Sequence, residues 1–172
     1  MKEIEFVQRV VPLRDRMFRY ARMLLLSDED ARDTVYDLLE HLWRHRDALD
    51  SQRNIASFVL TSVRNRCYDS LRQRYAQRRR DETATLLSER TTTRAIEEWE
   101  ARDLIRHAMD ALPHRQREIL YLKEIEGTPI SEIAEATAAD EAVVRVLLSR
   151  ARRKLREEIE KILNDERIRK TD

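Results

Sequence analysis

Residues 128–156 read TPISEIAEATAADEAVVRVLLSRARRKLR, and this stretch decides the fold of the C-terminal half of the chain. It begins with a predicted short helix, for which Thr128 is the expected N-cap and Pro129 the first helical residue. A tight turn at Ala138 follows, and Asp140 is the expected N-cap of a longer helix. In that helix the apolar residues recur every three or four positions and form one stripe: Val144, Leu148, Ala151, Leu155 and Ile159. The pattern predicts two helices joined by a short turn, with one face of the second helix packed on a core.

The flank beside this apolar stripe is strongly basic. Between Arg145 and Arg156 there are six Lys or Arg residues and no Asp or Glu, although the whole chain carries a net charge of only +1. The positive charge is therefore segregated onto one helix that follows a short helix and a turn. This combination is the sequence form of a helix-turn-helix, whose second helix enters the major groove of DNA. Taken alone, the segment also fits a basic helix face that is simply solvated.

The composition favours an all-α protein. The 172 residues include only one Gly and three Pro, so the residues that commonly form the turns between β-strands are rare. Charged residues make up 39% of the chain. Such a balance is typical of amphipathic helices around thin cores. The single cysteine, Cys67, excludes an internal disulfide framework and suits a reducing cytoplasm. The longest aliphatic run, residues 23–26, is far too short to span a membrane, so we expect no membrane insertion.

Helical periodicity divides the chain into two domains. Predicted helices cover residues 4–26, 28 to about 47, and 54 onward, and the second of these has an acidic outer face. Periodicity is lost over residues 76–94, where a charge run and three consecutive threonines read as a flexible linker. We therefore predict two small helical domains, at 1–75 and 95–165, with a linker over 76–94 and a tail over 166–172.

No group of side chains points to catalysis, a metal or a cofactor. His41 and His45 are four residues apart and share a helix face, but two ligands do not complete a metal site. The carboxylates of the acidic helix are expected to face solvent, and we find no nucleophile–base set and no phosphate-binding loop. We expect a protein that is not an enzyme, with no catalytic residues, no metal and no cofactor.

Four sequence blocks, taken in order, are characteristic. Two lie in the N-terminal domain, DARDTVYDLLEHLWRHRDAL at 30–49 and FVLTSVRNRCYDSLRQR at 58–74. Two lie in the C-terminal domain, ALPHRQREILYLKEIEGTPISEIAEA at 111–136 and VRVLLSRARRKLREEI at 144–159. In this order and spacing they resemble the extracytoplasmic-function (ECF) sigma factors of bacterial RNA polymerase, which implies sigma region 2 in the first domain and region 4 in the second. This resemblance further implies a cytoplasmic protein that directs core polymerase to specific promoters and initiates transcription.

The resemblance also implies roles for particular residues. The acidic helix would dock on the clamp helices of the largest polymerase subunit through Asp33, Tyr36, Asp37 and Glu40. The proximal promoter element would be opened and read at Asn65, Asp69 and Arg72, with Arg74 beside them and Tyr75 as a candidate stacking platform. The helix beginning at Glu141 would enter the major groove of the distal element. Its expected DNA contacts are Arg145 as a base reader, Ser149, and the phosphate-binding Arg150, Arg152, Arg153 and Lys154.

Two departures from the family pattern keep alternatives open. The docking helix has Arg32 in place of an acid and Tyr36 in place of a glutamine. The recognition helix carries Val143, Val146 and Leu147 where many relatives have polar residues, and such side chains can contact thymine methyl groups without forming hydrogen bonds. The implied partners are core RNA polymerase, promoter DNA, and an anti-sigma factor or other regulatory protein. The alternatives are a stand-alone helix-turn-helix regulator, or a helical module that docks on polymerase or an inhibitor without reading DNA.

Overall fold

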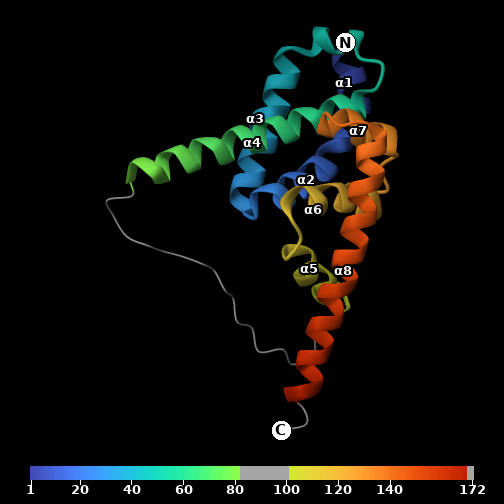
Figure 1. Cartoon of the computed structure of the whole chain (residues 1–172). Coiled ribbons are helices and arrows are strands. Elements are labelled where there is room, and N and C mark those ends of the chain that lie inside the picture. The colour runs from blue at the N-terminus through green and yellow to red at the C-terminus, as the bar shows by residue number, and fades with distance from the viewer. Residues whose placement is uncertain (82–100, 170–172) are drawn as a thin grey trace.

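The computed structural model describes residues 1–81 and 101–169, and every regular element in these ranges is a helix. The N-terminal domain (residues 1–81) contains α1 (Glu3–Arg9), η1 (Val11–Leu13), α2 (Arg14–Leu25), α3 (Asp28–Arg44), η2 (Arg46–Ser51) and α4 (Ile55–Asp81). The C-terminal domain (residues 101–169) contains α5 (Ala101–Asp110), α6 (His114–Leu120), the π-helical turn η3 (Tyr121–Ile125), α7 (Ile130–Thr137) and α8 (Glu141–Arg169), as Figure 1 shows. The prediction of an all-α protein with two helical domains is confirmed.

The N-terminal domain is built on α2, α3 and α4, which pack against one another. Met17 on α2, Val35 on α3 and Val63 on α4 are among the buried residues that form its core. Ser27 caps α3, because its hydroxyl oxygen accepts a hydrogen bond of 3.3 Å from the backbone N–H of Asp30. The predicted apolar stripes therefore place the acidic residues of α3 on its outer face.

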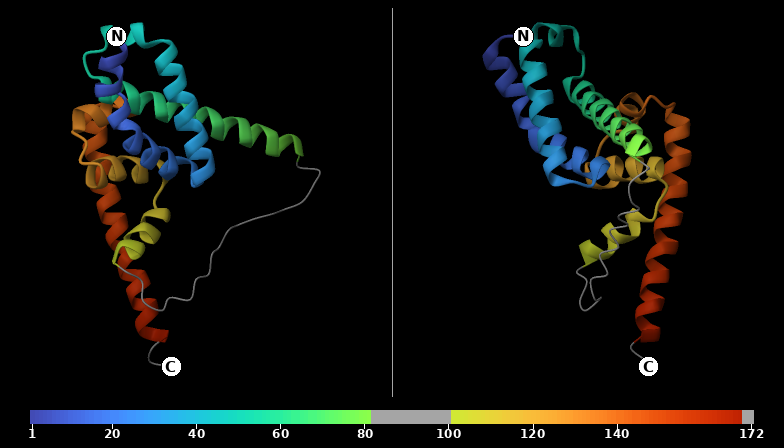
Figure 2. Two further views of the ribbon diagram at one scale, coloured as in Figure 1. Left: turned by 180° about the vertical axis from the view of Figure 1, so that it is seen from behind. Right: turned by 90° about the vertical axis from the view of Figure 1, so that its left-hand side faces the viewer.

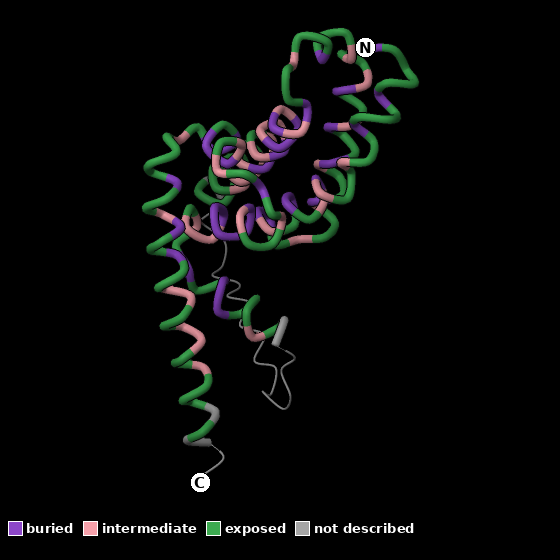
Figure 3. Tube along the Cα trace, turned by 90° about the vertical axis from the view of Figure 1, so that its right-hand side faces the viewer, coloured by how far each residue is buried: buried purple, intermediate pink, exposed green. Residues whose placement is uncertain are grey.

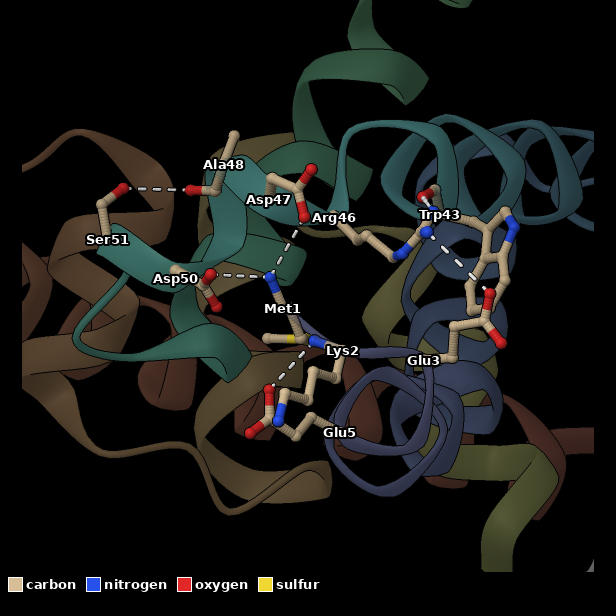
Figure 4. Close-up of polar contacts among 10 residues, drawn as sticks. All are labelled: Met1, Lys2, Glu3, Glu5, Trp43, Arg46, Asp47, Ala48, Asp50 and Ser51. Carbon is tan, nitrogen blue, oxygen red and sulfur yellow. Dashed lines mark hydrogen bonds and ion pairs between the residues drawn. The ribbon is translucent and has the colours of Figure 1, made fainter.

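The first residues of the chain are fastened to the end of α3 and to η2 (Figure 4). The Met1 amine donates a hydrogen bond of 2.7 Å to Asp50 and lies 3.4 Å from a carboxylate oxygen of Asp47. The ring of Phe6 meets the ring of Trp43 edge-to-face, with centroids 5.1 Å apart. Trp43 is thus a packing residue, as its helical spacing suggests.

The C-terminal domain contains the predicted helix-turn-helix. Ile133 on α7 and Val144 and Leu148 on α8 are buried, α8 packs against both α6 and α7, and Ala138 forms the turn between α7 and α8. The predicted cap of α7 is wrong. Pro129 occupies the cap position, and Thr128 is buried and accepts a hydrogen bond of 2.6 Å from Arg16 of the other domain.

Two helices extend beyond the predicted domain boundaries. Helix α4 continues to Asp81, so residues 76–81, in the predicted linker, are helical. Helix α8 continues to Arg169, through most of the predicted tail. Neither extension contains Gly or Pro, so nothing in these residues interrupts the backbone hydrogen bonds of the helix. The rest of the predicted linker, residues 82–94, lies outside the described residues.

The two domains pack side by side. Figures 1 and 2 show α7 lying across the N-terminal part of α4, with α6 beside α2. Buried apolar residues of both domains belong to one continuous cluster, whereas Figure 3 shows the last turns of α8 projecting away from it with mostly exposed residues. None of the described helices is both long and apolar enough to cross a membrane.

The left-handed turn of the helix-turn-helix gives a stability prediction. Ala138 has φ 50°, a region that costs a residue with a Cβ about 1–2 kcal/mol. Ala138→Gly removes this cost but loses about 0.4–1 kcal/mol through the more flexible unfolded chain. We expect a net gain of about 0.5 kcal/mol in the free energy of unfolding, measured by urea denaturation.

Ala142→Gly is the matched control, because Ala142 lies in the first turn of α8 with helical backbone angles. It should lower stability by up to about 1 kcal/mol. A lower stability of Ala138→Gly would contradict the strain assigned to this turn.

Candidate functional site

The four predicted docking residues are all exposed on α3, and three of them line two different grooves. Asp33 and Asp37 line a polar groove between α3 and α4. Tyr36 lines a second groove, between α2 and α3, together with Phe18. Glu40 forms an ion pair of 2.5 Å with Arg44 one turn further along α3. The outer face of α3 therefore offers carboxylates on one flank and an exposed aromatic ring on the other.

The groove between α3 and α4 brings predicted polymerase-binding and DNA-binding residues together. Asp69 and Arg74 of α4 line it opposite Asp33 and Asp37. Arg74 pairs with Asp30 of α3, and this hydrogen bond lowers the pKa of the Asp30 carboxyl. Arg74 thus connects α4 to α3, whereas its predicted role was DNA contact.

The remaining predicted residues of α4 lie on one exposed face. Asn65, Asp69, Arg72 and Tyr75 follow one another at helical spacing, and all four are exposed. Arg72 lies 3.4 Å from Asp69 in an exposed ion pair. The Tyr75 ring is available for stacking, because 66% of the residue is exposed. This face combines an amide, a cation and an aromatic ring.

The predicted cations of α8 fall into two groups. Arg145 pairs with Glu141 at 2.9 Å, Arg152 bonds to Glu124 of η3 at 2.9 Å, and Lys154 pairs with Glu158 at 3.1 Å. Arg150 and Arg153 are exposed, and no carboxylate in the described part of the chain pairs with either. Ser149 is exposed beside Arg150. Arg150 and Arg153 are therefore the cations most readily available to phosphates.

The first turns of α8 present apolar side chains next to Arg145. Val143 is 41% exposed and Val146 is 49% exposed, while Leu147 is half-buried. The charge of Arg145 is balanced by Glu141 within the same helix. The end of α8 that a helix-turn-helix inserts into the groove therefore offers methyl groups beside one paired arginine.

Sequence reasoning missed a cluster where the two domains meet, centred on Glu118 of α6. Glu118 is completely buried, yet three side chains of the N-terminal domain donate hydrogen bonds to it. The Tyr20 hydroxyl bonds at 2.7 Å, Arg64 Nε at 2.8 Å and the Tyr68 hydroxyl at 3.1 Å. An acid in the apolar run EILYL was the only available signal, and nothing in the sequence indicates its distant partners.

The buried carboxylate changes the ionisation of its neighbours. Burial, and then the charge of Glu118, raises the pKa of Tyr20 well above its usual range and that of Tyr68 to about 12. Burial opposes the charge on Arg64, but the hydrogen bond and charge of Glu118 outweigh it and raise the pKa of the guanidinium. Both tyrosines therefore remain donors and Arg64 remains charged.

A second carboxylate, Glu126 of the C-terminal domain, is held by α2 in the same way. Arg19 donates to its two oxygens at 2.8 and 3.0 Å, and Arg16 Nε lies 3.7 Å away. The Tyr121 hydroxyl, from the same domain, donates at 2.8 Å. Burial would raise the pKa of Glu126, but the hydrogen bonds from Arg19 and Tyr121 outweigh it and lower that pKa. The contact between the domains therefore contains two ionic interactions, one at Glu118 and one at Glu126.

Both halves of the chain match sequence profiles of one protein family. The profile described as "Sigma-70 region 2" matches residues 10–77, and "Sigma-70, region 4" matches residues 102–155. These two matches coincide with the two helical domains. No match to a curated protein sequence was found.

Solved structures that share the fold over about nine-tenths of this chain include the following three complexes. The sigma factor RpoE, in a complex with the anti-sigma factor NepR from Bartonella quintana, is 22% identical with a TM-score of 0.75 and covers 91% of this chain and 97% of its own. CnrH, in a complex with the cytosolic domain of CnrY, is 19% identical with a TM-score of 0.66, and the match covers 93% of this chain and 90% of CnrH. A chain of the PhyRSL–NepR complex from Sphingomonas sp. Fr1 is 16% identical with a TM-score of 0.61, and the match covers 90% of this chain and 88% of that one.

The contact between the domains should weaken in mild acid. Nδ1 of His114 lies 3.0 Å from the Tyr68 hydroxyl, and burial lowers the pKa of His114 below its usual 6.5, with Arg117 and Arg64 adding to the shift and Glu118 opposing it. Separated domains would therefore bind a proton at His114 at a higher pH than packed domains do. The contact is fully stable above about pH 6.5 and weakens as pH falls through the lowered pKa. We therefore expect the radius of gyration, measured by small-angle X-ray scattering, to increase as the pH is lowered.

His114→Gln should remove the pH dependence over this range, whereas His45→Gln, on the far end of α3, should retain it. A radius of gyration that is constant down to about pH 5.5 would contradict the role of His114.

Proposed function

Because the chain belongs to the sigma-70 family and is an ECF-type sigma factor with regions 2 and 4, we propose a division of work between its domains. The N-terminal domain binds core RNA polymerase through α3 and opens the proximal promoter element at α4. The C-terminal domain binds the distal element through α8. The observation that carries this proposal is that each matched region is a folded helical domain and that all its predicted binding residues except the half-buried Arg74 and Lys154 are exposed.

Promoter opening follows from differential binding and needs no catalytic group in this chain. The exposed face of α4 supplies hydrogen-bonding groups at Asn65, a cation at Arg72 and a stacking surface at Tyr75. These groups can bind bases only when the bases are unpaired, so binding shifts the duplex toward its open form. Polymerase carries out nucleotide addition, and we infer that the sigma factor is not an enzyme and acts in the cytoplasm with polymerase.

A regulatory protein is a further proposed partner. The similar RpoE structure is a complex with an anti-sigma factor, and the CnrH structure is a complex with the cytosolic domain of CnrY.

The apolar Val143 and Val146 also favour a second candidate function, in which this end of α8 contacts a protein instead of DNA. Transcription from promoter fragments by core polymerase, with and without the chain, tests the main proposal. Stable core binding without specific transcripts would favour the second function.

The proposed dock on α3 gives a prediction about polymerase binding. Asp33→Arg combined with Asp37→Arg reverses the charge along the groove between α3 and α4 and should weaken binding to core polymerase about tenfold or more, equivalent to about 1.4 kcal/mol. Both residues are exposed, so the fold should lose only about 0.5 kcal/mol of stability. Fluorescence titration of core enzyme measures the affinity. Glu157→Arg with Glu160→Arg, an equal charge change on α8, should bind like the wild type, and equal losses in both variants would rule out a specific dock.

The apolar side chains in the first turns of α8 give a prediction about the recognition of DNA bases. If Val146 contacts a thymine methyl, replacing that thymine by uracil removes only the methyl group and should weaken binding of the distal element about fourfold, since a buried methyl contributes about 0.8 kcal/mol. Val146→Ala should bind the thymine and uracil duplexes alike. Arg150→Ala should weaken both duplexes equally, because a phosphate contact does not depend on sequence. Uracil substitution that has no effect at any thymine of the element would exclude methyl readout.

A further inference from the structure

The packed arrangement of the domains covers part of a cationic surface of the N-terminal domain, leaving Arg16 and Arg64 mostly buried and Arg19 half-exposed. Arg16 and Arg19 of α2 face Glu126, and Arg64 of α4 faces Glu118. We call these three residues the arginine strip and the two acids the interdomain carboxylates. Each interdomain carboxylate comes from the C-terminal domain, so the charge of the arginine strip is balanced only while the domains are packed together.

The arginine strip is one surface, although it comes from two helices. Tyr20 lies next to Arg19 on α2, and its hydroxyl donates to the same oxygen of Glu118, Oε1, as Arg64 Nε from α4. Tyr68, one turn beyond Arg64, donates to the other oxygen. Three guanidinium groups and two phenol hydroxyls thus converge on two anionic sites. A phosphodiester carries the same single negative charge as a carboxylate and accepts the same bidentate arginine contacts.

This surface adjoins the predicted DNA-binding face of α4. Arg64 and Tyr68 each precede a predicted DNA contact, Asn65 and Asp69, by one residue. One residue is a rotation of about 100° around a helix, so the two rows lie next to each other along α4. A strand whose bases contact Asn65 would carry its phosphates toward the arginine strip. Tyrosines interleaved with arginines are typical of surfaces that bind single-stranded nucleic acid.

We propose that the arginine strip is a phosphate-binding site for single-stranded promoter DNA, and that the interdomain carboxylates occupy it in place of phosphates when DNA is absent. This inference rests on the proposed function. The chain then contains its own competitor for DNA. Opening of the domains and binding of the strand are one coupled equilibrium, because Glu118 and Glu126 must leave before phosphates can enter.

The position of the helix-turn-helix agrees with such competition. Asn54 donates a hydrogen bond of 2.9 Å to Glu132 of α7. Asn54 precedes Asn65 by 11 residues, which is about 16 Å along the axis of α4. One turn of DNA is about 34 Å, so the packed form holds α7, the first helix of the helix-turn-helix, within about half a turn of DNA from Asn65 along α4. We therefore assign the packed form to the state without promoter DNA.

The test uses the full chain with Glu118→Gln and Glu126→Gln, which keep the shape of both side chains and remove their charge. Opening is measured by small-angle X-ray scattering, and DNA binding by the anisotropy of a short fluorescent single-stranded DNA of mixed sequence. We expect an increased radius of gyration and binding at least about tenfold tighter than wild type at low salt. The log–log salt dependence should steepen by about 1.4, since each of the two phosphates that replace the carboxylates contributes about 0.7 on single strands.

Three matched variants separate this mechanism from a general charge effect. Glu157→Gln with Glu160→Gln removes the same charge at exposed positions of α8 and should leave both measurements near wild type. Adding Arg16→Ala, Arg19→Ala and Arg64→Ala to the Gln variant should abolish the gain in binding. Asn54→Cys with Glu132→Cys, joined by a short bis-maleimide, should hold the domains together and block the gain. Circular dichroism confirms that each variant is folded.

Each outcome decides the proposal. A Gln variant that opens without binding DNA more tightly would overturn it, and would leave the arginine strip as a surface for an acidic protein segment. A gain in binding that survives removal of the three arginines would also overturn it. A wild-type chain that fails to direct transcription with core polymerase would refute the proposed function, whereas the anisotropy results would stand independently.

Discussion

The relative position of the two domains depends on one buried carboxylate, Glu118. A charge with no access to water is stable only when partners surround it, and here all three direct partners, Tyr20, Arg64 and Tyr68, belong to the other domain. A buried ion pair adds little net stability compared with an apolar contact, but breaking it is costly because a charge is left unpaired. The carboxylate therefore fixes one geometry of packing, and another anion or water can replace it when the domains separate.

The helices could be predicted from the sequence because their signals are local. The stripe from Val144 to Ala151 specifies the buried face of α8, and Ser27 marks the start of α3 through its hydroxyl. The two-domain, all-α fold followed from such patterns. The end of α4 did not, since residues 76–81 lack an apolar stripe and yet extend the helix from its preceding turn.

The contact between the domains could not be predicted, because its signals are not local. Tyr20 and Glu118 are 98 residues apart, and each is unremarkable in its own segment. Thr128 shows the same limitation. Its sequence context predicts a helix cap, but the folded chain places its hydroxyl against Arg16 from the other domain. The exposed binding residues of α3, α4 and α8 were identified through resemblance to a family, whereas their ion pairs, such as Arg145 with Glu141, required the structure.

The groove between α3 and α4 connects two proposed binding events. Asp33 and Asp37 are proposed to contact polymerase, and Asp69 and Arg74, on the opposite wall, belong to the helix proposed to contact DNA. The ion pair between Arg74 and Asp30 joins the two walls. A protein bound along α3 would therefore change the electrostatic environment of α4 directly, because the two sets of residues share one groove.

Helix α8 runs without interruption from Glu141 to Arg169, a length of about 43 Å. Its first turns carry the residues proposed to enter the groove, and its last turns project beyond the rest of the molecule (Figure 3). A continuous helix transmits tilt along its whole length, so it acts as a lever with the helix-turn-helix as its short arm. A change of tilt at the projecting end would therefore reach the DNA-facing end of the same helix.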